Sequence, residues 1–141
     1  MMEVCGINGG ACCHCEPVCD CRRYEEPAPM MTLDEYQNEA LTTAIFPQRG
    51  EFPGMMYLGL GLTGEAGEVT DHLKKAFRDD GSEILPARRA EIKKELGDVM
   101  WYVAVLASEL GFTLGDVART NTAKLASRKS RGVLGGSGDN R

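Results

Sequence analysis

Two pairs of carboxylates in this sequence have a spacing that would place both acids of each pair on one face of a helix. Glu65 and Glu68 form the first pair, and Glu95 and Asp98 form the second after a gap of 26 residues. Helix positions three apart are neighbours, about 5–6 Å apart at Cβ. Apolar residues flank both pairs, so the acids border a predicted core. Carboxylates gathered there would repel one another unless cations joined them, and oxygen ligands suit Mg²⁺ or Mn²⁺.

Divalent ions held by these four carboxylates would polarise phosphoryl oxygens and lower the pKa of water. Such a site is suited to cutting a phosphoanhydride bond. Any single pair is more simply explained as solvated acids balanced by lysines. Two pairs in adjacent predicted helices, both beside glycine and an apolar stripe, favour the metal site. The alternative is a non-catalytic helical module that binds a cation or a basic partner.

The elements that must position the acids are predicted to be helices. Residues 32–128 show four helical patterns, short loops and no convincing strand, which indicates an all-α bundle. Thr32 and Glu35 form a capping box that starts a helix over about 33–45. The second helix is expected over 55–78. Its inward-facing positions are expected to be Leu58, Leu62, Val69, Leu73, Ala76 and Phe77.

Two further helices are predicted in the second half of the domain. Pro86 is expected to open a long third helix that Gly111 closes. Thr113 then resembles the N-cap of a last helix. The inward stripe of the third helix is predicted to contain Ile92, Leu96, Val99, Met100, Val103, Leu106, Ala107 and Leu110.

One motif in the second helix has a competing interpretation. Gly59, Gly61 and Gly64 have the spacing of the dinucleotide-binding fingerprint. That fingerprint has meaning only between a strand and a helix of a βαβ unit. No strand-like run follows, because residues 74–81 are charged and 83–94 have a helical pattern. We therefore interpret the segment as helical, with glycines that permit close packing or leave room for a ligand.

Length and charge narrow the class of protein. The 141 residues allow one domain, and the formal net charge of −5 gives no support to nucleic-acid binding. No apolar run reaches the roughly 18 residues of a membrane span, and the N-terminus lacks a signal-peptide pattern. We expect a cytoplasmic protein without a membrane partner. Its parts are an extension and linker at 1–31, the helical domain at 32–128, and a basic, glycine-rich tail at 129–141.

The N-terminal extension contains all six cysteines of the chain and one of its two histidines, His14. In a reducing cytosol such residues could hold a structural Zn²⁺, but their spacing is not that of a standard finger or ribbon. A reduced, cysteine-rich tail is the preferred interpretation. The cysteines are Cys5, Cys12, Cys13, Cys15, Cys19 and Cys21.

The two acidic pairs and their surroundings resemble the signature of MazG-like nucleoside triphosphate pyrophosphohydrolases, an all-α superfamily. The similarity includes the stretches 58–69 and 95–102. It covers about 32–138 in total. Many members carry a further glutamate where this chain has Gly64, which implies fewer metals or a water in place of that ligand. Outside the acidic stretches, the matching positions are Asn121, Lys124, Leu125 and Arg128.

The resemblance implies Mg²⁺-dependent hydrolysis of an NTP or dNTP between the α and β phosphates, giving a monophosphate and pyrophosphate. It assigns metal binding and catalysis to Glu65, Glu68, Glu95 and Asp98. It also implies pairing of chains, as a homodimer or homotetramer.

Substrate contacts are implied for residues beyond the acids. Tyr102, one turn after Asp98, would face the substrate, and Asn121 and Lys124 would hold phosphate and sugar or base. Lys75 and Arg128 are further phosphate candidates, whose alternative is ordinary surface charge. Of the remaining residues, Trp101 is expected in the core, and His72 is expected to be exposed and uninvolved.

Overall fold

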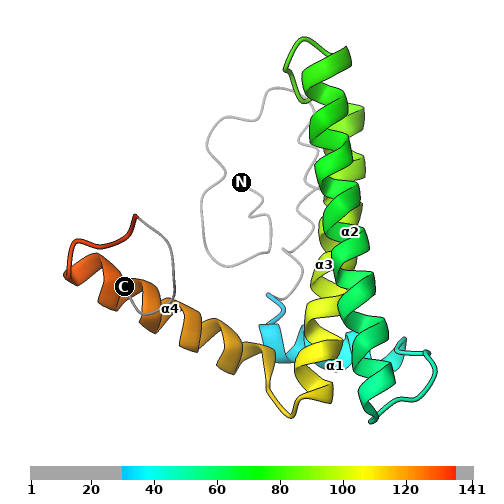
Figure 1. Cartoon of the computed structure of the whole chain (residues 1–141), viewed down its shortest axis with the longest axis vertical. Helices are drawn as coiled ribbons and strands as arrows, with labels where there is room; N and C mark the ends of the chain where they lie inside the picture. Colours follow the sequence, from blue (N-terminus) through cyan, green and yellow to red (C-terminus); the bar gives the residue numbers. More distant parts are fainter. Residues whose placement is uncertain (1–29, 136–141) are drawn as a thin grey trace, which may run out of the picture. The chain divides into compact units, whose positions relative to one another are not determined.

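The computed structural model describes residues 30–135. Four helices and no strand are found in this range (Figure 1), which confirms the all-α prediction. By their contacts, residues 31–135 belong to one unit. The six cysteines lie outside the described residues, so the zinc hypothesis stays untested. The helices are α1 (Leu33–Thr42), α2 (Phe52–Asp79), α3 (Pro86–Glu109) and α4 (Leu114–Ser130).

Helix α1 starts as predicted but ends earlier. The backbone N–H of Thr32 donates to Glu35 Oε2 at 2.7 Å, and the N–H of Glu35 donates to Thr32 Oγ1 at 3.1 Å, which completes the capping box. The helix was expected to continue to about residue 45. Instead the hydroxyls of Thr42 and Thr43 donate to carbonyls three residues back. These side chains compete with the backbone for hydrogen bonds and favour the end of a helix.

Helix α2 is continuous over the leucine–glycine stretch. It begins at Phe52, three residues before the predicted start, because Pro53 is compatible with the first turn of a helix. The glycines at 59, 61 and 64 all lie inside this helix. The strand–turn–helix that a dinucleotide site requires is therefore absent from the described range, and the helical interpretation is correct.

The connection between α3 and α4 contains the helix-ending glycine and the N-cap threonine that the sequence predicts. Gly111 has a φ of +78°, in the left-handed region where glycine is favoured. The N–H of Phe112 donates to the carbonyl of Ala107 at 2.8 Å, and that of Gly111 donates to Ser108 at 2.9 Å. This is a Schellman motif. One residue later, the Thr113 hydroxyl caps α4 by accepting from the N–H of Asp116.

The core lies where α1, α2 and α3 meet. Helices α2 and α3 lie side by side along most of their length (Figure 1), and α1 packs against α3. Helix α4 contacts α1 and α3, but none of its Cα atoms lies within 8 Å of one in α2. Thus the first three helices build the centre, and α4 is attached through its first turns. The buried cluster consists of Ala40, Ala44, Leu58, Ala104, Val105 and Leu114.

A buried amide joins three of the helices. The Gln37 side chain, in α1, is part of a residue only 6% exposed. Its Nε2 donates to the carbonyls of Ala104 in α3 and Phe112 in the following loop, both at 3.0 Å. Its Oε1 accepts from the N–H of Leu114, the first residue of α4, at 2.9 Å. One side chain thereby sets the position at which α4 leaves the core.

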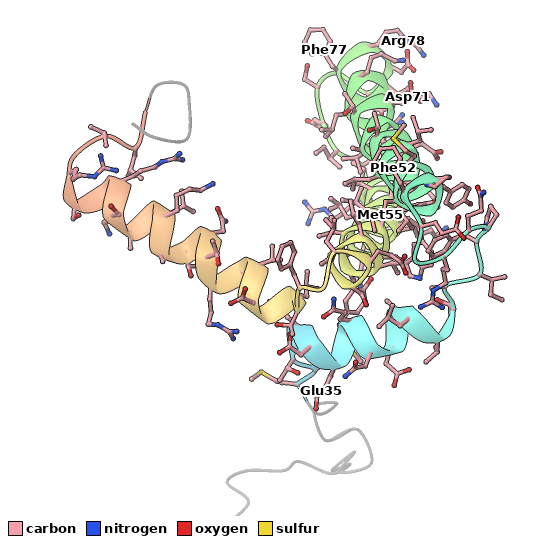
Figure 2. All side chains as sticks on the ribbon, turned by 60° about the horizontal axis from the view of Figure 1, so that its bottom comes forward. Glu35, Phe52, Met55, Asp71, Phe77 and Arg78 are labelled. Atoms are coloured by element: carbon pink, nitrogen blue, oxygen red, sulfur yellow. The ribbon has the colours of Figure 1, made fainter. Side chains whose placement is uncertain are left out.

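Several apolar residues predicted to face inward are exposed, so this part of the expectation was wrong. Leu73 is 45% exposed, and Phe77, at the end of α2 in Figure 2, is 77% exposed. On α3, the same holds for Leu96, Met100 and Leu110. The physical reason is that α3 is the one helix of the described residues that packs along the C-terminal half of α2, which contains Leu73 and Phe77. Neither α1 nor α4 contacts α2 there. No helix in the range 30–135 is both long and apolar enough to span a membrane.

Candidate metal centre

Three carboxylates from α2 and α3 converge in one place. Glu65, Glu95 and Asp98 each offer an oxygen, and these three oxygens lie within 4.8 Å of one another. Glu65 and Glu95 are half-buried, whereas Asp98 is exposed. The side-by-side packing of the two helices produces this convergence, because each acid lies on the face of its helix that points toward the other helix.

The electrostatics of the cluster favour a bound cation. Partial burial raises the pKa of Glu65, and the negative charges of Glu68, Asp98 and Glu95 raise it further. A raised carboxyl pKa means that the fourth negative charge is unfavourable in this setting. A divalent cation would remove that penalty, and a donor set made only of carboxylate oxygens suits Mg²⁺ or Mn²⁺. The residues present therefore fit the implied metal.

The fourth predicted ligand lies slightly apart. Glu68 is exposed and is not among the three acids whose oxygens gather within 4.8 Å. Its charge is nevertheless close enough to raise the pKa of Glu65, one turn earlier on α2. The structure thus brings three of the four acids together and leaves Glu68 at the rim of the cluster. Gly64 has no atom within 4 Å of its would-be Cβ, so nothing in the described residues crowds that position.

Tyr102 lies beside the acids, as its spacing from Asp98 predicts. Burial raises the pKa of its hydroxyl first of all, followed by the neighbouring Tyr57 and the charges of Glu65 and Asp98. The ring packs directly on the backbone of α2 at Gly61. A Cβ placed on Gly61 would lie 2.2 Å from Cε1 and 2.7 Å from the hydroxyl oxygen of Tyr102. Glycine at this position therefore makes room for the tyrosine.

Because of this close approach, we expect Gly61→Ala to change the stability in opposite directions when the Tyr102 ring is present and when it is absent. In the parent protein, Gly61→Ala should lower the free energy of unfolding by about 1–2 kcal/mol, because the new methyl group displaces the Tyr102 ring. In a Tyr102→Ala protein the same change should raise it by about 1 kcal/mol, since alanine favours a helix over glycine. Urea unfolding of the four proteins measures both values.

Gly59→Ala is the matched control for this cycle, because Gly59 is in the same helix and a Cβ there meets nothing within 4 Å. It should stabilise the protein in both backgrounds. Equal effects of Gly61→Ala with and without the Tyr102 ring would contradict the proposed contact.

The substrate-binding residues predicted on α4 lie on a helix that contacts α3 but not α2. Asn121 is exposed and lines an apolar groove with Val99 and Val103 of α3. Lys124 borders a neighbouring cavity together with Asn121. No Cα of α4 lies within 8 Å of one in α2, the helix that carries Glu65 and Glu68.

The two weaker phosphate candidates differ in their surroundings. The ammonium of Lys75 forms an ion pair with Asp71, at 2.5 Å, on the surface of α2. Arg128 is only 5% exposed, which does not fit the alternative of an ordinary surface charge. Trp101 is half-buried against the core and donates from Nε1 to the Thr43 hydroxyl at 2.8 Å, consistent with its predicted core position.

His72 was expected to be exposed, but it is half-buried instead. Its Nε2 lies 3.7 Å from Glu95 Oε1, and its side chain is 22% exposed. The signal was present in the sequence, because His72 follows Glu65 by seven residues and Glu68 by four, which is the spacing of one helix face. Tyr36 of α1 was also missed as a site residue. Burial and the charge of Asp98 raise the pKa of its hydroxyl.

Comparison with known proteins agrees with this geometry. Residues 56–133 match the MazG nucleotide pyrophosphohydrolase domain. The Gene 37 protein of Mycobacterium phage L5 is 48% identical over 114 residues, which cover 79% of this chain and all of that protein. No solved structure matches the chain. The matched region covers more than half of the sequence and contains the whole carboxylate cluster, and so this chain belongs to the MazG nucleotide pyrophosphohydrolase family.

Proposed function

We propose that this protein is a Mg²⁺-dependent nucleoside triphosphate pyrophosphohydrolase that cleaves an NTP or dNTP between the α and β phosphates. The products are a nucleoside monophosphate and pyrophosphate. The observation that carries the proposal is the convergence of Glu65, Glu95 and Asp98, whose mutual repulsion a divalent cation would relieve. Membership of the MazG family supports the reaction class.

In this proposal, each acid has a stated task. Glu65, Glu95 and Asp98 would hold Mg²⁺, with Mn²⁺ as a substitute, and Glu68 at the rim would be the fourth ligand. The chemistry that Mg²⁺ would supply there is polarisation of the phosphoryl oxygens and a lower pKa of the attacking water. The Tyr102 hydroxyl, next to Glu65 and Asp98, donates a hydrogen bond to the substrate and orients it. The pKa of this hydroxyl is raised above its ordinary value, so the group is protonated at neutral pH and can donate.

We further propose that the site is completed by a second copy of the chain, in a homodimer or a homotetramer. Asn121 and Lys124, the proposed contacts to phosphate and sugar or base, lie on a helix that does not approach α2 of its own chain. The α4 of a neighbouring copy would bring them to the acids. Lys75 and Arg128 are proposed as additional phosphate contacts. The unusually exposed apolar residues of α2, Phe52 and Leu60 at 73% and 69%, support association through this helix.

A panel of NTPs and dNTPs tests the function. Each nucleotide is incubated with the protein and Mg²⁺, and released pyrophosphate is measured together with orthophosphate. We expect pyrophosphate as the product and a loss of about 100-fold or more for Glu95→Ala. Full activity of the Glu68→Ala and Glu95→Ala proteins would contradict the site. Thermal stabilisation by the cation without turnover of any nucleotide would indicate the non-catalytic module instead.

A further inference from the structure

The imidazole of His72 lies at the edge of the acidic cluster and has no task in the proposed reaction. Its Nε2 is 3.7 Å from Oε1 of Glu95, and the two side chains are 22% and 15% exposed. His72 belongs to α2 and Glu95 to α3, so this contact joins the two helices that carry the carboxylates. It is made to one of the three acids whose oxygens converge.

The hydrogen-bonding state of the ring can be inferred from its surroundings. Nδ1 of His72 is buried and has no hydrogen-bond partner among the residues that the structure describes. A neutral imidazole carries one N–H, and a buried N–H without an acceptor is costly. A proton on Nε2 would instead face the carboxylate of Glu95, whose Oε1 lies 3.7 Å away. This tautomer directs the ring at Glu95.

Glu95 is a carboxylate that needs such a donor. It is 15% exposed and lies beside two other acids, Glu65 and Asp98, which offer it repulsion rather than hydrogen bonds. Carboxylates that ligate a metal are usually held by a hydrogen bond to an outer residue, which orients the oxygen that faces the ion.

We infer that His72 is a positioning residue, which holds one carboxylate oxygen of Glu95 so that Glu95 is oriented to bind the divalent cation. This inference rests on the proposed function, because it assumes that Glu95 is a metal ligand. The distance of 3.7 Å is longer than an N–H···O bond of about 2.9 Å. Hydrogen bonds in catalytic sites are often long without ligand and tighten when it binds.

The test is direct measurement of cation affinity in the full chain. Mn²⁺ is titrated into the parent, His72→Leu and His72→Gln proteins at one fixed pH, and free Mn²⁺ is followed by electron paramagnetic resonance. We expect His72→Leu to weaken Mn²⁺ binding about 10–100-fold, the range found when outer-shell partners are removed. His72→Gln should restore most of the affinity, because its amide N–H reaches nearly as far as Nε2 of histidine.

Lys74→Leu is the matched control on the same helix. It removes a charged group two residues after His72 whose partner is Asp71 rather than Glu95, so this variant should bind Mn²⁺ as the parent does. Thermal unfolding in chelator verifies that each variant is folded before its affinity is compared. His72→Ala serves as a second variant if leucine disturbs the packing.

Two results would overturn the positioning role. One is a His72→Leu protein that binds Mn²⁺ as tightly as the parent, and the other is a His72→Gln protein as weak as His72→Leu. The nucleotide panel remains a separate measurement. A parent that binds Mn²⁺ but releases no pyrophosphate would refute the proposed function. The effect of the His72 substitutions on Mn²⁺ affinity could still be measured in that case. A parent that binds no Mn²⁺ would refute both.

Discussion

Glu65→Gln protein is expected to release pyrophosphate at least about 100-fold more slowly than the parent, and yet to unfold at a higher temperature when a chelator is present. The loss of activity follows from removing a proposed metal ligand. The gain in stability follows from removing one of four negative charges that destabilise each other in the absence of a cation. Activity and stability should therefore change in opposite directions.

The sign of the pH dependence supports a sharper version of this experiment. The pKa of Glu65 is raised above its ordinary 4.5 by burial and by neighbouring acids, so the folded chain holds this proton more tightly than the unfolded chain. The destabilisation caused by the negative charge of Glu65 is thus absent below about pH 4.5 and is fully present above the folded-state pKa. We expect the stability difference between Glu65→Gln and the parent to grow across this window as pH rises, as measured by urea unfolding in chelator.

The control for this prediction is Glu39→Gln, which neutralises an exposed acid of α1 outside the cluster. Its effect on stability should be small at any pH, as is usual for surface positions. If Glu65→Gln were less stable than the parent in chelator at neutral pH, the mutual repulsion of the four acids would be disproved. Addition of Mn²⁺ should reverse the order, since the parent alone retains the full set of ligands and gains stability by binding.

Gln37→Leu protein is expected to lose about 2–4 kcal/mol of unfolding free energy, the largest effect on stability among these predictions. Leucine has a similar volume, but it leaves the carbonyl of Phe112 and the N–H of Leu114 without their partner in a buried place. Each unsatisfied buried group costs about 1–3 kcal/mol. Urea unfolding followed by circular dichroism gives the value.

The neighbouring residue provides the comparison for this change. Asn38 is exposed on the same helix, so Asn38→Leu should alter stability by no more than about 0.5 kcal/mol. Equal effects at both positions would show that the buried amide is not what joins α1, α3 and α4. Because Gln37 also determines where α4 begins, its loss should weaken any association of chains that depends on α4.

Much of the local structure could be predicted from the sequence. The capping box at Thr32, the left-handed glycine at 111 and the N-cap at Thr113 depend on backbone hydrogen bonds to residues close in the chain, and all three are present. The two acidic pairs could be predicted for the same reason, since residues three apart on a helix share a face. The carboxylate cluster could thus be predicted once two adjacent helices had been recognised.

Other features could not be predicted because they depend on which helix packs against which. The exposure of Leu73 and Phe77 follows from having α3 as the one neighbour along that half of α2. A hydrophobic pattern identifies one face of a helix, but it does not say how many partners cover that face. For the same reason, the placement of Asn121 beside Val99 and Val103 is decided by the packing of α4 on α1 and α3.

The sequence by itself determined the helical class, the identity of the acids and the family to which the chain belongs, because these depend on short-range spacing and on residue type. Only the tertiary structure decided which acids share a centre and which other residues reach it. Glu65, Glu95 and Asp98 converge, Glu68 stays at the rim, and His72 contacts Glu95. The physical reason is that such contacts join separate helices, whose relative rotation is set by packing in the core.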